Sequence, residues 1–240
     1  LDISDININS NKKNHFYKRL LKNQNNKKNS IIAEIKRRSP SKGMLAENLN
    51  VSKTVSEYES GGAACISVLT EKDYFNGSNE DLLEAKNSIN LPLLRKDFML
   101  DPIQIYESKM LGADCVLLIV SALSQSTYKQ LFELASKLDL DVLTEVHDIY
   151  ELDFALSQNA KLIGINNRNL KTFDVDINTS KDLASTIDDN DIVLVSESGI
   201  SSRSDIITLN SSGIYTFLVG EHLIKSKNIT NELGVLINGE

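Results

Sequence analysis

Short apolar runs recur along the chain from residue 31 onward and are separated by amphipathic segments. The runs are rich in Val, Ile and Leu, and successive runs begin roughly 20 to 34 residues apart. Runs that are continuously apolar, rather than alternating with polar residues, are typical of parallel strands covered on both faces. The pattern predicts eight such strands, over residues 31–35, 65–69, 91–94, 115–120, 142–146, 162–165, 192–195 and 214–219.

The segments between these runs carry apolar residues three and four positions apart, which is the period of an amphipathic helix. The stripe over residues 51–58 ends at the Gly61-Gly62 pair, which suits a helix C-cap. The stripe over residues 103–111 has Pro102 at the first helical position and Gly112 after its end. Comparable stripes predict three more helices. One covers residues 128–138 and is started by Ser124 or Ser126, one follows a cap at Asp148 and includes Leu152 and Leu156, and one lies around residues 16–21.

Eight strands with seven intervening helices, and an eighth helix from Leu223 onward, are the elements of a (β/α)8 barrel. A length of 240 residues fits that architecture, for which about 250 residues are usual. A doubly wound open sheet is the alternative, but residues 39–43, Ser-Pro-Ser-Lys-Gly, are no nucleotide-binding fingerprint after the first strand. We therefore expect an α/β fold, a single (β/α)8 TIM barrel over residues 31–240. Residues 1–30 are expected to form a polar, basic, partly helical N-terminal extension.

Charge and hydropathy exclude two kinds of partner. The longest apolar run, residues 115–120, is far shorter than the roughly 20 residues that a membrane-spanning helix needs, so no membrane partner is expected. The net charge is −7, yet residues 1–40 carry ten Lys and Arg against three Asp and Glu. A basic arm can bind nucleic acid, but these lysines are interleaved with Asn, and only Phe16 and Tyr17 could stack on bases. We expect a solvated leader and no nucleic-acid partner.

No residues have the spacing of metal ligands. The histidines, His15, His147 and His222, are far apart, and the two cysteines, Cys65 and Cys115, form no C-x-x-C pair. Solvated or capping roles are expected for the histidines, and a role as small hydrophobes for the cysteines. We expect no metal, and free thiols fit a reducing compartment, the cytoplasm.

Polar residues gather where the predicted strands end. In (β/α)8 barrels the chemistry is carried at that C-terminal face, and charged groups there are costly unless they are paired or functional. Five strand ends that deliver charged or amide groups towards one mouth therefore indicate a functional site. They are Glu34-Ile35-Lys36, Arg95-Lys96-Asp97-Phe98, Thr144-Glu145-Val146, Asn166-Asn167-Arg168 and Ser196-Glu197-Ser198-Gly199.

The alternation of side chains along a strand decides which of these residues face the mouth. Glu34 and Lys36 are two positions apart and share a side, either as functional groups or as a structural ion pair at the rim. Arg95 and Lys96 are neighbours, so only one of them faces inward. The other is then free to solvate a loop.

The middle strands carry two further polar positions of interest. Glu145 stands between apolar residues, an odd place for a surface carboxylate, and this favours a functional role. Asn166 and Asn167 either contribute to the site or only shape a turn.

Small residues after the last two strands predict an anion site. Ser198-Gly199-Ile200 follows the seventh strand, and Gly220-Glu221 follows the eighth. Backbone N–H groups at such positions can approach a phosphate, a helix starting near Glu221 would add to the attraction, and barrels often bind phosphate between these two loops. The alternative is that Gly199 serves only as a turn. Because the Glu221 carboxylate would repel a phosphate, only its backbone N–H is expected to take part.

Six motifs follow one another over residues 31 to about 224. They are residues 32–43 (IAEIKRRSPSKG), 66–70 (ISVLT), 75–78 (FNGS), 94–98 (LRKDF), 163–170 (IGINNRNL) and 195–200 (VSESGI). In sequence and in order they resemble the motifs of the indole-3-glycerol phosphate synthase family. The family uses no cofactor or metal and belongs to tryptophan biosynthesis. It converts 1-(2-carboxyphenylamino)-1-deoxyribulose 5-phosphate to indole-3-glycerol phosphate, CO2 and water.

The resemblance also implies roles for individual residues. Lys96 is expected to be the general acid of ring closure, and Glu145 the general base of the dehydration. Lys36 is expected to hold the anthranilate carboxylate, with Glu34 orienting it. Further positions are expected to position hydroxyl and ammonium groups (Asn166, Arg168, Glu197), to surround the phosphate (Ser39, Ser198, Gly199, Gly220, Glu221) and to pack on the anthranilate ring (Phe75, Phe98).

Family members usually have a longer N-terminal extension whose helices cover the top of the site, so residues 1–30 are expected to close it less well. Two other functions are considered. A different phosphate-binding barrel, such as a phosphosugar isomerase, needs an Asp/Cys or Glu/His pair at other strand ends, and none is found. A non-catalytic barrel would bind the phosphate compound without turnover. The expected partner is a phosphorylated small molecule, and the expected assembly is a monomer or weak homodimer.

Overall fold

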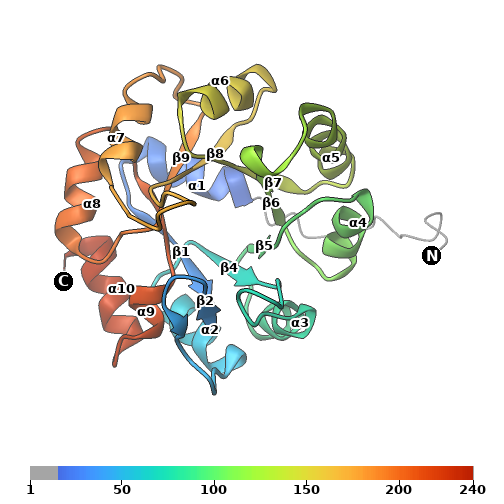
Figure 1. The fold of residues 1–240 in the computed structure, drawn as a ribbon. Coiled ribbons are helices and arrows are strands. Elements are labelled where there is room, and N and C mark those ends of the chain that lie inside the picture. Colours follow the sequence, from blue (N-terminus) through green and yellow to red (C-terminus); the bar gives the residue numbers. More distant parts are fainter. Residues whose placement is uncertain (1–15, 240) are drawn as a thin grey trace.

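The computed structural model describes residues 16–239 and has a closed barrel of parallel strands at its centre, surrounded by helices (Figure 1). Neighbouring strands follow the order β1-β10-β9-β8-β7-β6-β5-β4, and β4 pairs back to β1. The predicted (β/α)8 barrel is thus confirmed. Part of the predicted basic extension, residues 1–15, lies outside the described residues.

The barrel strands lie on the predicted apolar runs, with differences at their ends. β5 and β9 run on to Lys96 and Glu197, past the last apolar residue, because polar residues continue the backbone ladder: Leu69 pairs with Lys96, and Asn166 with Glu197. The strands are β1 (Ser30–Ile35), β4 (Cys65–Leu69), β5 (Leu93–Lys96), β6 (Cys115–Ile119), β7 (Asp141–Val146), β8 (Leu162–Asn166), β9 (Val193–Glu197) and β10 (Thr216–Val219).

Helices connect successive strands on the outside of the barrel. Pro102 lies in the first turn of its helix, and Ser124 and Asp148 cap the next two, as predicted. The predicted eighth helix is two helices, and no helix within residues 16–239 is long and apolar enough to cross a membrane. The helices after β1 are α2 (Val51–Ser60), α3 (Asn79–Ser88), α4 (Pro102–Met110), α5 (Gln125–Lys137), α6 (Ile149–Ser157), α7 (Asn178–Ala184), α8 (Arg203–Asn210), α9 (Glu221–Ile224) and α10 (Ile229–Asn238).

Both faces of the strands are buried, which explains why their sequences are continuously apolar. Along β1, Ile31, Ala33 and Ile35 pack with helix residues in the large outer core. Ile32 instead belongs to a second cluster that fills the barrel, together with Leu94, Leu143 and other alternate strand residues. One strand therefore sends successive side chains to two different cores.

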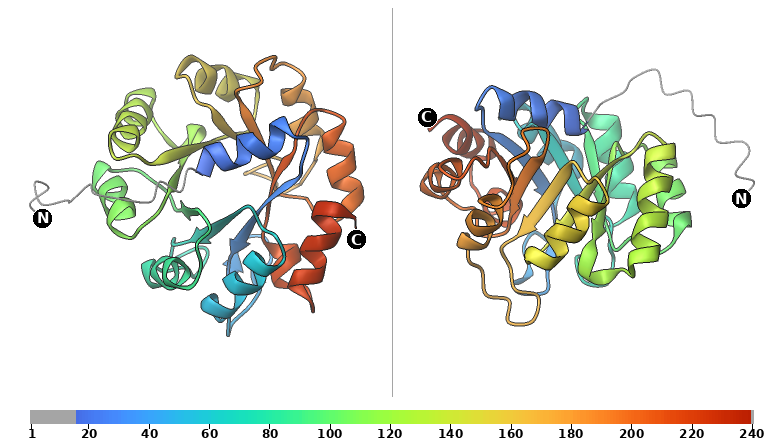
Figure 2. Two further views of the ribbon diagram at one scale, coloured as in Figure 1. Left: turned by 180° about the vertical axis from the view of Figure 1, so that it is seen from behind. Right: turned by 90° about the horizontal axis from the view of Figure 1, so that it is seen from above.

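Helix α1 (Phe16–Asn25) closes the N-terminal end of the barrel. Phe16 and Leu20 are fully buried in the barrel's inner cluster, so the helix predicted around residues 16–21 is present. The Tyr17 amide donates to Asp141 at the start of β7, and Gln24 Nε2 donates to the Ile192 carbonyl before β9. Figure 2 shows α1 across the end of the barrel opposite the loop between β8 and α7. This helix does not cover the mouth at the C-terminal strand ends.

Candidate active site

A cavity of about 430 Å³ opens at the C-terminal ends of the strands. Its walls come from strand ends all round the barrel and from the loops that follow them. A small hairpin after β1, made of β2 (Arg38–Ser39) and β3 (Gly43–Met44), contributes Ser39 to its wall. Every residue that the sequence assigned to the site lines this cavity: Glu34, Lys36, Ser39, Phe75, Lys96, Phe98, Glu145, Asn166, Arg168, Glu197, Ser198, Gly199, Gly220 and Glu221.

Two ammonium groups and two carboxylates form a chain of ion pairs across the cavity floor. Lys96 Nζ lies 2.7 Å from Glu197 Oε2 and 3.4 Å from Glu34 Oε2. The other oxygen of Glu34, Oε1, lies 2.5 Å from Lys36 Nζ. Glu34 therefore holds both lysines, and the predicted shared side of Glu34 and Lys36 is confirmed.

The ion pairs keep Glu34 and Lys96 charged although both are buried. Burial alone raises the pKa of the Glu34 carboxyl, but the charges of Lys36 and Lys96 outweigh it and hold the pKa below its usual range. Burial lowers the pKa of Lys96, but the carboxylates of Glu197, Glu34 and Glu145 raise it well above its usual value. Lys96 is thus a fully protonated acid at neutral pH, enclosed by negative charge.

Glu197 is the carboxyl of the cavity floor that is most easily protonated. Burial raises its pKa to about 7, and the Glu145 carboxylate adds to this, while Lys96 opposes it. Only Oε2 is paired; Oε1 is buried without a hydrogen-bond partner among the described residues. Oε1 lies where a side chain at Gly164 would be, so the missing Cβ makes room for this carboxyl.

Glu145 is held by an amide whose orientation the structure fixes. The Asn166 oxygen Oδ1 accepts hydrogen bonds from the Arg168 amide at 3.0 Å and from Ser198 Oγ at 2.9 Å. Its Nδ2 must therefore point the other way, and it donates to Glu145 Oε1 at 3.1 Å. Asn167 forms a separate buried network with Ser196 and other groups behind the strand, so only Asn166 of the pair reaches the cavity.

His147 lies beside Glu145, which the sequence reasoning did not foresee. Its Nε2 is 3.4 Å from Glu145 Oε1, and its Nδ1 is 3.0 Å from Glu151 Oε2. The signal was available, because residues 145 and 147 are two apart on β7 and its extension and share a side. The capping role expected for His147 accounts for its contact with Glu151 but not for its contact with Glu145.

Aromatic side chains form one wall of the mouth. The rings of Phe75 and Phe98 have centroids 6.4 Å apart and are tilted by 49°. Tyr74, which the sequence reasoning missed, packs edge-on against Phe98 at 6.3 Å. These rings belong to the loops after β4 and β5, and a planar aromatic ligand can pack against them.

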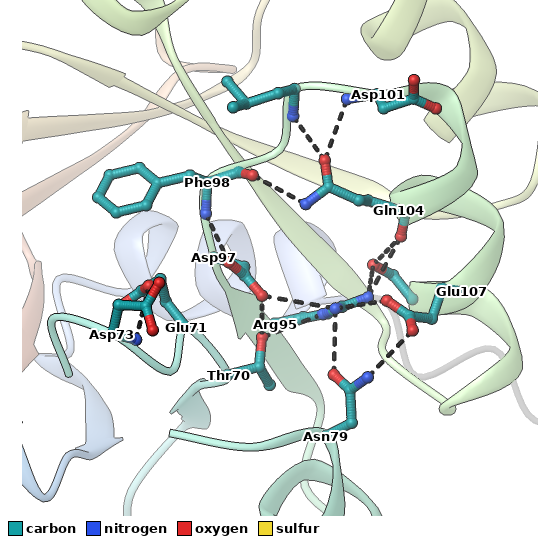
Figure 3. A network of polar contacts seen from close by, with 12 residues as sticks. Thr70, Glu71, Asp73, Asn79, Arg95, Asp97, Phe98, Asp101, Gln104 and Glu107 are labelled. Carbon is teal, nitrogen blue, oxygen red and sulfur yellow. Dashed lines mark hydrogen bonds and ion pairs between the residues drawn. The ribbon is translucent and has the colours of Figure 1, made fainter. Parts of the chain in front are cut away.

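Arg95 anchors the loop that carries Phe98. It points away from Lys96, as alternation requires, and its buried guanidinium pairs with Glu107 at 2.6 Å and Asp97 at 3.4 Å. Asp97 Oδ1 in turn accepts the Phe98 amide at 2.8 Å. Figure 3 shows Arg95 between Asp97, Asn79 and Glu107, below the loop that ends at Asp101. Arg95, on the side of β5 that faces the helices, thus supports Phe98, which lines the cavity.

The opposite wall is made of small residues and exposed backbone. Gly199 has φ +84°, and a Cβ there would meet Val175 Cγ1 at 2.5 Å. A Cβ on Gly220 would come within 2.5 Å of Glu34 Oε1. The Glu221 carboxylate is paired with Lys225 at 2.6 Å, and this leaves its backbone N–H as the group that can serve an anion. A helix does begin at Glu221, although α9 is only one turn long.

Residues 16–239 contain no group of His, Cys, Asp and Glu that could hold a metal ion. What they contain is a (β/α)8 barrel with ammonium and carboxylate groups on the cavity floor, aromatic rings on one wall and bare backbone on the other. This is the arrangement of a barrel enzyme that acts on an aromatic, anionic molecule.

Comparison with known proteins gives the family. The sequence model of the indole-3-glycerol phosphate synthase family matches residues 2–236. An indole-3-glycerol phosphate synthase of Carboxydothermus hydrogenoformans is 46% identical over 218 residues, which are 91% of this chain and 83% of that protein. The chain belongs to the indole-3-glycerol phosphate synthase family.

Solved structures of low sequence identity share the fold. Thiamine phosphate pyrophosphorylase from Pyrococcus furiosus has a TM-score of 0.63 at 15% identity, over 88% of this chain and 94% of that one. N-acetylmannosamine-6-phosphate 2-epimerase from Clostridium perfringens has a TM-score of 0.62 at 14% identity, over 83% and 89%. These two similarities concern the barrel alone.

Proposed function

We propose that the cavity converts 1-(2-carboxyphenylamino)-1-deoxyribulose 5-phosphate to indole-3-glycerol phosphate with loss of CO2 and water. Family membership gives the reaction. One observation supports its location: Lys96 Nζ is held between Glu197 and Glu34 on the floor of the cavity that Glu145 also lines. An acid and a base in one enclosed space are what ring closure and dehydration need.

Lys96 is the proton donor in ring closure. The ring carbon that bears the carboxylate attacks the ketone carbon, and the ketone oxygen takes a proton from the Lys96 ammonium as its C=O double bond becomes a C–OH group. Loss of CO2 then returns the bonding electrons to the ring and restores its aromaticity. Glu34 and Glu197 hold the ammonium in place, and the positive charge is available where the oxygen becomes negative.

Glu145 is the base of the dehydration. The new hydroxyl takes a proton from the Lys36 ammonium, which lines the same cavity, and leaves as water. Glu145 removes the proton from the neighbouring CH2 group to form the indole double bond. Asn166 fixes one oxygen of Glu145. Burial raises the pKa of Glu145, but its contacts with His147 and Lys96 lower it overall, so the base is ionised at neutral pH.

The two ends of the substrate fit the two walls. Lys36 binds the anthranilate carboxylate, and Phe75 and Phe98 contact the ring. Ser39 and the backbone of residues 198–199 and 220–221 surround the phosphate, and Arg168 binds substrate hydroxyls. In the proposed arrangement the phosphorylated small molecule lies across the cavity floor, with its ketone near Lys96.

We assign the reaction to the cytoplasm. Cys65 and Cys115 are free and buried, and burial raises the pKa of both thiols. Free cysteines of this kind are usual in a reducing compartment.

The test is product formation by the purified protein. Incubation with the carboxyphenylamino substrate should give an indole fluorescence signal and one CO2 per indole. Absence of product at high enzyme concentration would reject the proposal. Tight binding of the substrate without turnover would favour a non-catalytic barrel instead.

A further inference from the structure

His147 lies just before α6, between Glu145, which lines the cavity, and Glu151 in the first turn of that helix. Its side chain is only 15% exposed, with Glu145 on the cavity side and Glu151 on the other. Two contacts with Glu151 Oε2 hold the ring in this orientation: the His147 backbone N–H donates to it at 2.8 Å, and Nδ1 lies 3.0 Å from it. Glu151 Oε2 therefore clamps His147 through two of its atoms, the backbone N and Nδ1, and this directs Nε2 towards Glu145.

The carboxylates on both sides favour the protonated imidazole. Nε2 is buried, and in residues 16–239 it has no hydrogen bond of good geometry, only the 3.4 Å contact with Glu145 Oε1. Burial lowers the pKa of His147, but Glu145 and Glu151 outweigh it and raise the pKa to about 10. An imidazolium has an N–H for each of the two carboxylates, whereas a neutral ring has one N–H and can donate to only one of them.

We propose that His147, clamped by Glu151, is a positioning residue that places a positive charge beside Glu145 and holds this carboxylate ionised towards the cavity. The inference rests on the proposed function only in taking Glu145 as the base. His147 itself touches no reacting atom. It acts as outer groups do in other sites, where a hydrogen bond from a second residue orients the residue that does the chemistry.

Other charged and polar groups also act on Glu145, and their effects have to be separated from that of His147. Lys96 on β5 lowers its pKa, and Asn166 on β8 donates a hydrogen bond to it. The Glu197 carboxyl on β9 is raised in pKa by Glu145, so the two carboxylates repel each other when both are charged. His147 is the only one of these groups on β7's own extension, and substituting it leaves the others in place.

The experiment measures the Glu145 carboxyl directly as well as turnover. In the full chain with carbon-13-labelled glutamate, NMR titration gives the carboxyl pKa of Glu145 in the wild type and in His147→Gln. The variant should raise that pKa by about 1 unit or more, because an opposite charge within 4–6 Å shifts a carboxyl by this amount. The acidic limb of kcat against pH should move upward equally, with little change in KM.

Two further variants make the result specific. Glu151→Gln keeps an acceptor for the His147 backbone amide but removes the charge, and should give a smaller shift in the same direction; it also serves if His147→Gln fails to fold. Tyr150→Ala, at an 81% exposed position one residue before Glu151, should leave the pKa and the profile unchanged.

The outcomes separate this inference from the proposed function. An unchanged Glu145 pKa in both variants, with kcat lowered equally at every pH and a lower Tm, would mean that His147 only stabilises the start of α6 through Glu151 and would overturn the inference. A raised Glu145 pKa with an unmoved kcat profile would support the pairing but reject Glu145 as the base.

Discussion

Lys96 and Glu197 are 101 positions apart in the sequence, yet Lys96 Nζ donates a hydrogen bond to Glu197 Oε2 at 2.7 Å. Three strands separate β5 from β9 in either direction round the barrel. The ion pair therefore spans the mouth rather than joining neighbours. Both groups are buried, so the contact is little screened by salt and fixes the position of the ammonium on the cavity floor.

Replacing Lys96 by Met removes the ammonium but keeps most of the side-chain volume. Turnover should fall on the order of 10²-fold or more, which is the effect of losing a general acid. The matched control is Lys161→Met, which removes a half-exposed lysine paired with Asp189 far from the cavity, and it should keep the wild-type rate. Indole fluorescence measures both. A rate for Lys96→Met within a few-fold of the control would remove Lys96 from the mechanism.

Glu197→Gln should change stability in a pH-dependent way. The folded protein holds a proton on Glu197 up to pH about 7, whereas the ordinary value is 4.5. Between these values the folded state binds more protons than the unfolded state, so this carboxyl lowers the free energy of unfolding as pH rises. The Gln variant lacks the effect. Between pH 4.5 and pH 8 the free energy of unfolding of the variant should therefore rise by roughly 3 kcal/mol relative to that of the wild type.

Urea unfolding of both proteins at pH 5 and pH 8 measures this difference. A variant that becomes less stable relative to the wild type at pH 8 would show that Glu197 is an ordinary ionised partner of Lys96.

Arg95 should not tolerate replacement by Lys. Its guanidinium bonds Thr70, Asn79, Ser108 and two carboxylates, and a single ammonium cannot reach them all. We expect loss of a few kcal/mol of stability, within the roughly 3–5 kcal/mol of a broken buried ion pair. KM should rise as well, because the Phe98 loop loses its anchor.

Thermal unfolding and steady-state kinetics check the Arg95 prediction. Lys86→Met, which breaks a partly exposed pair with Asp114, is the comparison and should cost at most about 1 kcal/mol. Equal Tm values for the two variants would show that the network has no special role.

Much of the barrel could be predicted because its strands are buried on both faces. Residues 162–165 are continuously apolar because their side chains pack in both the inner and the outer core, and strand β8 includes all four. The shared side of Glu34 and Lys36, and the opposite directions of Arg95 and Lys96, followed from the alternation of side chains in a strand. These are local rules, and they hold inside each strand.

What could not be predicted depends on distances between elements. The predicted strands 91–94 and 192–195 stop short of Lys96 and Glu197, although both side chains are expected at the mouth, because polar residues carry no apolar signal. Helix α1 was expected from its apolar stripe, but nothing in the stripe says which end of the barrel it closes. The sequence puts His147 two residues after Glu145, but it does not show that the Glu151 contact from α6 directs the imidazole towards Glu145.

The most direct test of the account follows CO2 and indole separately in Glu145→Gln. Gln can still accept the Asn166 hydrogen bond, so the geometry is kept while the base is lost. Because Lys96 acts before CO2 leaves and Glu145 acts after, a single turnover should release CO2 at close to the wild-type rate while indole forms about 10²-fold more slowly. If CO2 release and indole formation fall together by the same factor, the division of the two steps between Lys96 and Glu145 is wrong.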